Sequence, residues 1–224
     1  LSCSTSTPPK TCDSRNSSRI VWQLNCPPPT FTNSTQHHLS GSTIITISYS
    51  TADHKLQNMS RFIVNAPPGI IVEVGVWKGG SLRYLAERHP DRTFFGFDTF
   101  EGMPVTGERD NHHQQGHFGD TSLAEVAAAL TDLKNVTLGK GWFPDSDTTG
   151  DQRVAMVHVD VDIYTSTLNT FRHFRPRMSP GGRMYCDDAF QSTCHGATLA
   201  LCQFAAETSL VPQFDQGSHA AFCF

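Results

Sequence analysis

The most constraining feature of the sequence is a short apolar run that leads directly into a glycine turn. Residues 70–81 read IIVEVGVWKGGS, and the aliphatic side chains before Gly75 predict a strand covered on both faces by helices. Gly75, Gly79 and Gly80 allow a tight turn and a close approach of a ligand to the backbone, and Ser81 is placed to cap the next helix. The pattern therefore predicts a strand, a turn and a helix that form a candidate cofactor cradle.

Glu73, within this strand, bears on the kind of cofactor. A pyrophosphate favours the backbone N–H groups and the positive dipole of a helix N-terminus, and a neighbouring carboxylate does not help to bind it. S-adenosylmethionine carries a sulfonium and an ammonium group, so Glu73 favours this cofactor over a dinucleotide. A plain strand, turn and helix with a surface glutamate is the alternative that this stretch leaves open.

Length and charge narrow the class of protein. A chain of 224 residues is long enough for one α/β domain, and its net charge of −4, with no run of Lys or Arg, predicts no binding to nucleic acid or anionic lipid. No apolar run approaches the roughly 20 residues that span a bilayer, and the first thirty residues contain no signal-peptide pattern. We therefore expect a soluble, cytoplasmic protein, with its seven cysteines reduced.

The first part of the chain differs in composition from the rest. Residues 1–45 are rich in Ser, Thr and Pro and are interpreted as an N-terminal extension, disordered rather than a substrate lid, ahead of a domain at 46–224. Alternating apolar residues at 42–50 predict an added strand, which would make a homodimer plausible by pairing between subunits. Helical spacing follows at 53–64.

Asp98 and Trp142, which both follow the glycine turn in the sequence, are candidates for holding the ribose and the adenine of a nucleotide cofactor. Asp98 ends a short strand at 93–97, about twenty residues beyond the turn, where a carboxylate can accept hydrogen bonds from a ribose. A turn-capping aspartate is the alternative. Trp142 and Phe143 follow a strand at 135–138, and each ring is placed either to stack on an adenine or to pack in the core.

The segment 104–119 is long and polar and is predicted to be a mobile loop over the site. It holds His112, His113 and His117, a cluster that suggests a metal. We interpret these histidines as solvated instead, because a flexible loop without supporting partners rarely holds an ion. A helix with a capping box is expected to begin at Ser122.

Carboxylates also end two later strands. Asp160 follows the buried run that begins at Val154, and Asp187 and Asp188 follow the run RMYC. Because parallel strands end at the same edge of a sheet, these residues should converge with Glu73 and Asp98. Three clustered aspartates repel one another unless a cation lies among them, and oxygen ligands favour Mg²⁺. For Asp162 and His158, a helix cap and a hydrogen-bonded core histidine are the preferred interpretations.

The order of these segments predicts an α/β fold with a Rossmann-like, doubly wound, mostly parallel sheet. Helices are expected at 165–174 and 196–207, and residues 218–224 are expected to add an antiparallel edge strand.

Taken together, the motifs resemble those of one family. The blocks EVGVWKGGS (73–81), DTFEGMP (98–104), GDTSLAEV (119–126), GWFPDS (141–146), HVDVDIYTST (158–167), SPGG (179–182) and DDAFQSTCHGA (187–197) look like those of the TylF-type macrocin O-methyltransferases, which methylate sugar hydroxyls on antibiotics. The resemblance runs from about residue 59 to the C-terminus. It does not cover the first 45 residues, and His195 stands where the family usually has proline.

The resemblance implies a class I methyltransferase that uses S-adenosylmethionine and Mg²⁺ to methylate a hydroxyl of a small molecule. By motif, Glu73 and Gly75 would lie at the methionine end of the cofactor and Asp98 would hold the ribose. The metal ligands would be Asp160, Asp187 and Asp188, with Asp160 also the general base. Three other interpretations stay open at this point: a nicotinamide-dependent oxidoreductase, against which the three converging aspartates count, a cephalosporin hydroxylase-type enzyme, and a non-catalytic binding module.

Overall fold

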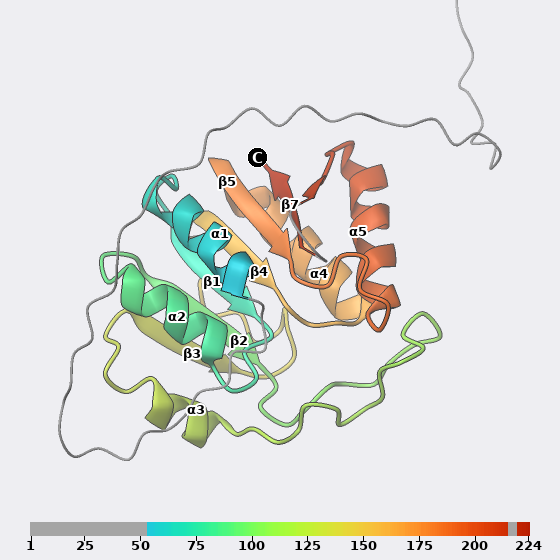
Figure 1. Ribbon diagram of the computed structural model, residues 1–224, viewed down its shortest axis with the longest axis horizontal. Coiled ribbons are helices and arrows are strands. Elements are labelled where there is room, and N and C mark those ends of the chain that lie inside the picture. The colour runs from blue at the N-terminus through green and yellow to red at the C-terminus, as the bar shows by residue number, and fades with distance from the viewer. Residues whose placement is uncertain (1–52, 215–218) are drawn as a thin grey trace, which may run out of the picture. The chain divides into compact units, whose positions relative to one another are not determined.

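The computed structural model of the protein describes residues 53–214 and 219–224 (Figure 1). These residues belong to the compact unit Ile44–Phe224. The predicted strand at 42–50 and the predicted N-terminal extension lie outside the described residues. Among the helices of the described part, none is both long and apolar enough to cross a membrane. The cysteines in this part, at 186, 194, 202 and 223, are free thiols, as predicted.

A seven-stranded sheet forms the centre of the described part, in the order β3-β2-β1-β4-β5-β7-β6 (Figure 1). The first five strands in this order run parallel and β7 runs antiparallel to both neighbours. The bounds are β1 Ile70–Val74, β2 Phe94–Asp98, β3 Val136–Lys140, β4 Val154–Val159, β5 Met178–Cys186, β6 Gln213–Phe214 and β7 Ala220–Cys223. The sequence prediction of an α/β fold with a mostly parallel sheet is confirmed.

Helices cover both faces of this sheet, as expected for a doubly wound fold. Side chains alternate along a strand, so in β1 Ile71 packs with the helices of one face while Val72 and Val74 pack with those of the other. The first face carries α1 Asp53–Val64, α2 Gly80–Arg88 and α3 Leu123–Ala129, and the second carries α4 Tyr164–Phe174 and α5 His195–Thr208. A 3₁₀ turn at Arg175–Arg177 joins α4 to β5.

Two local predictions need correction. Ser81 does not cap α2: the cap position is Gly79, whose φ of 80° is left-handed, and the Ser81 hydroxyl points instead at β1. The C-terminal strand β7 is not the edge of the sheet, because the two-residue β6 pairs with its outer side. The predicted cap at Ser122 is confirmed, since its side chain accepts a hydrogen bond from the N–H of Glu125.

Candidate active site

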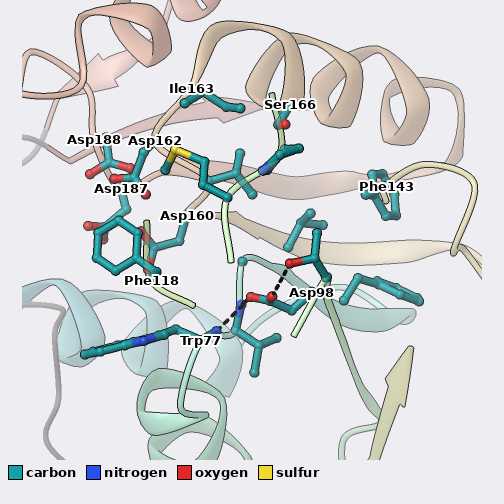
Figure 2. Close-up of a pocket in the computed structure, with 18 of the residues that line it drawn as sticks. Trp77, Asp98, Phe118, Phe143, Asp160, Asp162, Ile163, Ser166, Asp187 and Asp188 are labelled. Atoms are coloured by element: carbon teal, nitrogen blue, oxygen red, sulfur yellow. Dashed lines mark hydrogen bonds between the residues drawn. The ribbon is translucent and has the colours of Figure 1, made fainter. Parts of the chain in front are cut away.

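A cavity of about 590 Å³ opens at the carboxyl ends of β1, β2, β4 and β5. This is the edge of an open parallel sheet at which ligands bind, and the volume is that of a small-molecule site. Figure 2 shows Asp98 on one side of the cavity, and Asp160, Asp187 and Asp188 on another. Most of the residues predicted to form a site line the cavity: Gly75, Ser81, Asp98, Trp142, Asp160, Asp187 and Asp188. Glu73 and Gly79 are not among its lining residues, and the ligand roles of the whole set stay predictions.

The carboxylate of Asp98 holds the glycine turn in place. Its Oδ2 accepts hydrogen bonds from the N–H groups of Val76 and Trp77, both at 2.8 Å. Its Oδ1 accepts one from the N–H group of Phe100 at 2.7 Å. Figure 2 shows Asp98 beside Trp77. Trp77 and Phe100 both have positive φ, of 46° and 52°, which is uncommon for aromatic residues. Asp98 therefore fixes two sharp turns of the backbone at the mouth of the cavity.

Glu73 lies below the cavity because its side chain projects from the face of the sheet rather than from its edge. The carboxylate is 2% exposed, and its Oε1 accepts hydrogen bonds from the Ser81 hydroxyl at 2.5 Å and from Nδ1 of His158 at 2.8 Å. The Nε2 of His158 in turn donates to Oδ1 of Asp187 at 3.4 Å. His158 is fully buried, so its prediction as a hydrogen-bonded core histidine is confirmed.

The charges around His158 set its protonation state. Burial lowers the pKa of His158, but the hydrogen bonds to Asp187 and Glu73 and the charges of nearby carboxylates outweigh this and raise it well above the usual value. The imidazolium then donates from both ring nitrogens. A chain of hydrogen bonds thus runs from the Ser81 hydroxyl through Glu73 and His158 to Asp187, which lines the cavity.

The three aspartates predicted to hold a metal come together at the ends of β4 and β5. One carboxylate oxygen from each of Asp160, Asp187 and Asp188 lies within 4.8 Å of those of the others. Burial raises the pKa of Asp188 to about 8, with the charges of Asp162 and Asp187 adding to the effect. Burial and the same kind of repulsion raise the pKa of Asp160 well above its usual value.

This donor set fits a hard divalent cation. All three side chains offer carboxylate oxygens, which Mg²⁺ prefers, and Oδ2 of Asp188 is buried without a hydrogen-bond partner among the described residues. A cation among the carboxylates would satisfy that oxygen and relieve their mutual repulsion.

Lys55 is a residue of this site that the sequence analysis missed. Its ammonium donates to Oδ2 of Asp187 at 2.7 Å and to the backbone oxygen of the same residue at 2.8 Å. Burial raises the pKa of Asp187, but the hydrogen bond and charge of His158 and the ammonium of Lys55 lower it well below its usual value. The only sequence signal was an isolated lysine on an otherwise apolar face of the helix at 53–64, between His54 and Leu56.

Two predictions are wrong here, one for His113 in the loop 104–119 and one for Asp162 in the turn after β4. His113 is not solvated: its side chain is 10% exposed and lies against Asp162 and Cys194. Asp162 does not cap α4, because the N–H of Tyr164 donates instead to Oδ1 of Asp110, a residue of the loop, at 2.7 Å. His112 and His117 are exposed, as predicted.

Two aromatic rings at the exit of β3 have different surroundings. Trp142 lines the cavity and is 60% exposed, so its face is open to a ligand. Phe143 packs against Phe97 and Phe174 in the core, with ring centroids 5.4 and 5.2 Å away. The alternative of core packing therefore applies to Phe143 and not to Trp142.

Comparison with known proteins agrees with this architecture. The structure of the O-methyltransferase NovP superposes with a TM-score of 0.65 at 28% identity, covering 75% of this chain and 78% of that one. CalS11, a calicheamicin methyltransferase, gives a TM-score of 0.67 at 20% identity, with 76% and 77% covered. The fold is that of the class I S-adenosylmethionine-dependent methyltransferases.

Relatives found by sequence are named as O-methyltransferases. The mycinamicin III 3''-O-methyltransferase of Micromonospora griseorubida is 32% identical over 182 residues, which are 70% of this chain and 72% of the relative. The 8-demethyl-8-(2,3-dimethoxy-alpha-L-rhamnosyl)-tetracenomycin-C 4'-O-methyltransferase of Streptomyces olivaceus is 34% identical over 156 residues, 60% of this chain and 58% of the relative. The chain thus spans little more than half the length of that relative.

The match to the family as a whole is longer. Residues 44–215 match the macrocin-O-methyltransferase (TylF) family. The chain belongs to this family, as its motifs predicted.

Proposed function

We propose that the protein is an S-adenosylmethionine-dependent O-methyltransferase that methylates a sugar hydroxyl of a glycosylated natural product. The observation that carries the proposal is the cavity at the carboxyl edge of the sheet, which brings Asp98 and the acidic group Asp160, Asp187 and Asp188 to one chamber. Membership of the TylF family and relatives named for O-methylation support the same reaction.

In this proposal the cofactor lies across the mouth of the glycine turn. S-adenosylmethionine supplies a methyl group that its sulfonium already activates. The ribose would lie beside Asp98 and the adenine beside Trp142, both of which line the cavity. Glu73 and Gly79 would shape the turn from behind the cavity lining, since the Ser81 hydroxyl, which lines the cavity, donates a hydrogen bond to Glu73.

The acceptor hydroxyl would lie toward the acidic group. Asp160, Asp187 and Asp188 would hold Mg²⁺, which when bound lowers the pKa of a hydroxyl and orients it. Asp160 is the proposed general base, because its carboxylate lines the cavity together with the other two aspartates of the acidic group. Lys55 and His158 hold Asp187 ionised and fix its position.

The remaining contribution of the protein is positioning. Orienting two reactants can remove about 7–11 kcal/mol of a barrier. Met103 and Phe118, from the segment that follows β2, present apolar surface to the cavity and would exclude water from the reacting atoms. The intracellular location and the homodimer expected from the sequence stay predictions.

Two rival functions are distinguished by measurement. The family match favours methyl transfer over a nicotinamide-dependent oxidoreductase. A non-catalytic module with the same fold would bind S-adenosylmethionine and transfer no methyl group to any acceptor. Binding and turnover must therefore be measured separately.

The first experiment is isothermal titration of S-adenosylmethionine into the purified protein with and without Mg²⁺. It is followed by transfer of a labelled methyl group to glycosylated acceptors of the kinds named for the relatives. We expect micromolar binding, and turnover that EDTA abolishes. Asp187→Asn should abolish turnover and leave cofactor affinity within a few fold, while Asp145→Asn, an exposed carboxylate outside the cavity, should change neither.

Each outcome bears on a different part of the proposal. If folded protein does not bind S-adenosylmethionine, the methyltransferase assignment is wrong. Binding without turnover on any acceptor would favour the non-catalytic module. Turnover that persists in EDTA would remove Mg²⁺ from the proposal, and loss of cofactor binding in Asp187→Asn would contradict the separation of cofactor and metal residues.

A further inference from the structure

One wall of the cavity is apolar and open although it faces the acidic group. Of the large hydrophobic side chains that are exposed in the described part of the chain, Val105, Phe118 and Trp142 line this cavity. Trp142 stands at the exit of β3, whereas Val105 and Phe118 belong to the segment that follows β2. Phe118 is 46% exposed. An open apolar surface inside a pocket marks a place where a ligand buries apolar area.

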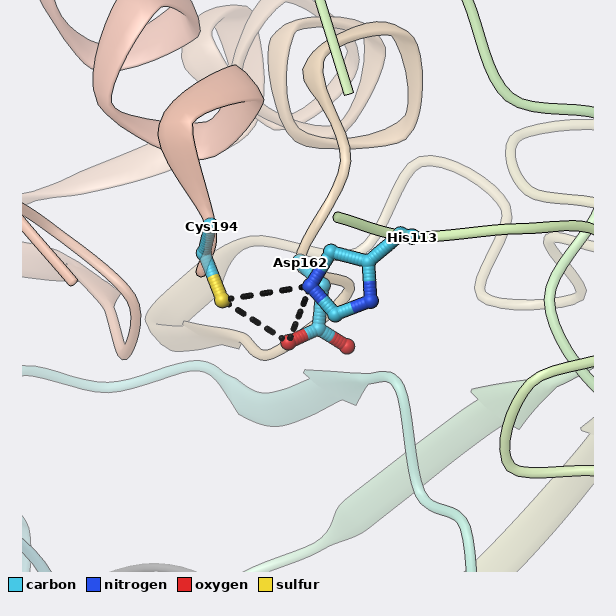
Figure 3. A group of neighbouring side chains, drawn as sticks. All are labelled: His113, Asp162 and Cys194. Carbon is cyan, nitrogen blue, oxygen red and sulfur yellow. Dashed lines mark hydrogen bonds and ion pairs between the residues drawn. The ribbon is translucent and has the colours of Figure 1, made fainter. Parts of the chain in front are cut away.

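The ring contacts of Phe118 place it between the glycine turn and the acidic group (Figure 2). On one side its centroid is 5.9 Å from the ring of Trp77, in the glycine turn, and on the other it is 6.2 Å from the imidazole of His113. Figure 3 shows that imidazole directed at Asp162, with 3.9 Å between Nε2 and Oδ1. Asp162 lines the cavity, and its charge acts on Asp188 of the acidic group.

The backbone fixes the ring of Phe118 in this position. Phe118 has a φ of 58°, in the left-handed region, which is uncommon for a bulky residue. The N–H of Met103 donates to the backbone oxygen of His117, one residue before the ring, at 2.7 Å. Gly102 packs against the same turn, because a Cβ there would lie 3.0 Å from that oxygen and 3.0 Å from Cα of Gly119. Strain of this kind tends to be kept where it presents a functional group.

Trp77 is held by bonds that do not involve Phe118. Its backbone N–H donates to Oδ2 of Asp98 at 2.8 Å, and its backbone oxygen accepts from the hydroxyl of Thr121 at 2.6 Å. Its indole N–H donates to Oδ1 of Asp120 at 2.8 Å. The indole therefore orients Phe118 by an edge contact, at an interplanar angle of 75°, and the glycine turn keeps its supports when that ring is replaced.

A phenyl face in this position suits a sugar ring. The face of a phenyl ring is negative and its edge positive, so the face attracts partly positive C–H groups. A pyranose presents C–H groups on the face of its ring, and its hydroxyls project around the edge. A pyranose stacked on Phe118 would therefore turn a hydroxyl toward the acidic group while its C–H groups leave water.

We propose that Phe118 is the stacking platform for the acceptor, on which the pyranose that receives the methyl group lies with its C–H face. The inference rests on the proposed function and adds to it the residue that orients the sugar between the methyl donor and the acidic group. Val105 borders the platform. Phe118 holds the sugar without touching the reacting atoms, so its contribution belongs to acceptor binding and not to the chemical step.

Saturation-transfer NMR tests this contact and needs no turnover. The probe is methyl α-L-rhamnopyranoside, added to the full chain with Mg²⁺ and S-adenosylhomocysteine, which has no methyl group to transfer. Trp, Tyr and His are deuterated, so irradiation of the aromatic protons excites phenylalanine rings alone. We expect saturation to reach the ring C–H protons of the pyranoside in the wild type and to be lost in Phe118→Leu. Open-chain L-rhamnitol should receive little in either protein.

Matched variants separate acceptor binding from packing. Phe118→Leu keeps an apolar side chain and removes the ring face, so kcat/KM for a glycosylated acceptor should fall about 2- to 12-fold, the worth of an aromatic contact beyond its area. The fall should lie in KM, with kcat and cofactor affinity within a few fold. Phe118→Tyr keeps the ring and should have a lower KM than Phe118→Leu. Phe214→Leu, an exposed ring outside the cavity, should match the wild type.

The outcomes distinguish this inference from the proposed function. An unchanged acceptor KM in Phe118→Leu, in a protein that does transfer methyl groups, would overturn the platform and leave the function standing. A loss of cofactor affinity in step with acceptor affinity would also overturn it, because the ring would then only pack the glycine turn. If the protein binds no S-adenosylmethionine, the function fails, and the pyranoside experiment is run without cofactor. Absence of transfer from phenylalanine to the pyranoside overturns the platform in either case.

Discussion

Replacing Asp98 by asparagine should destabilise the protein before any ligand is added. The carboxylate accepts three backbone hydrogen bonds, two at Oδ2 and one at Oδ1. An amide has one acceptor oxygen, so in Asp98→Asn at least one N–H group loses its partner and faces the amide N–H₂ instead. The other bonds lose the charge of their acceptor.

The size of the effect follows from this count. A hydrogen bond to a charged group contributes about 1.5–3 kcal/mol and one between neutral groups about 0.5–1.5 kcal/mol. Losing one charged bond and weakening two, at a half-buried position, should lower the free energy of unfolding by about 2–4 kcal/mol. For a domain of this size the melting temperature should fall by roughly 5–15 °C.

Thermal and urea unfolding without cofactor provide the assay. The matched control is Asp120→Asn, which removes an exposed carboxylate beside the same turn, 2.5 Å from Lys78. It should leave the free energy of unfolding nearly unchanged, because ion pairs between exposed side chains contribute little. If Asp98→Asn unfolds together with the control and only its cofactor affinity falls, Asp98 acts on the ligand alone and the reasoning is refuted.

Two further predictions concern Gly75 in the glycine turn and Asp147 in the segment between β3 and β4. Gly75→Ala should abolish cofactor binding or folding, because the φ of Gly75 is 92° and a Cβ there would lie 1.8 Å from the backbone oxygen of Asp160. Titration of the cofactor and circular dichroism would show which of the two is lost. Wild-type affinity in that variant would contradict the geometry. For Asp147, burial raises the pKa, but bonds from Thr149, His173 and Arg177 outweigh this and lower it to about 2 from a usual 3.8. Its contribution is therefore present above pH 4 and lost as the pH falls toward 2, so Asp147→Asn should reduce the free energy of unfolding by about 1–2 kcal/mol at pH 6 and by progressively less below pH 4. A reduction that did not change with pH would exclude the charge as its cause.

The parts of the site that could be predicted from the sequence are those set by the backbone alone. Asp98 and the aspartates after β4 and β5 each follow a buried apolar run, and parallel strands bring such positions to one edge whatever the side-chain packing. The family blocks point to the same residues.

The parts that could not be predicted depend on the direction of a side chain or on contacts between distant segments. Glu73 lies within a strand, so it projects from the sheet face toward Ser81 and His158 instead of into the cavity. Lys55 reaches Asp187 across 132 positions of sequence. His113 stands in a polar segment that carries no periodic pattern, and only the folded loop brings it to Cys194.

The anchoring of the loop 104–119 sets limits on how the specificity of such an enzyme can change. The loop is closed at its base by the backbone pairing of Met103 with Gly116 and His117, and Asp110 fixes its middle to α4. Gly196 leaves room for this anchor, because a Cβ at that position would lie 1.9 Å from Oδ1 of Asp110. The loop thus consists of two short spans with fixed ends. Each span could change in length or composition without moving the ends of the other. Under the proposed function, such a change would alter acceptor preference while the contacts of Asp110 and Met103 stay in place.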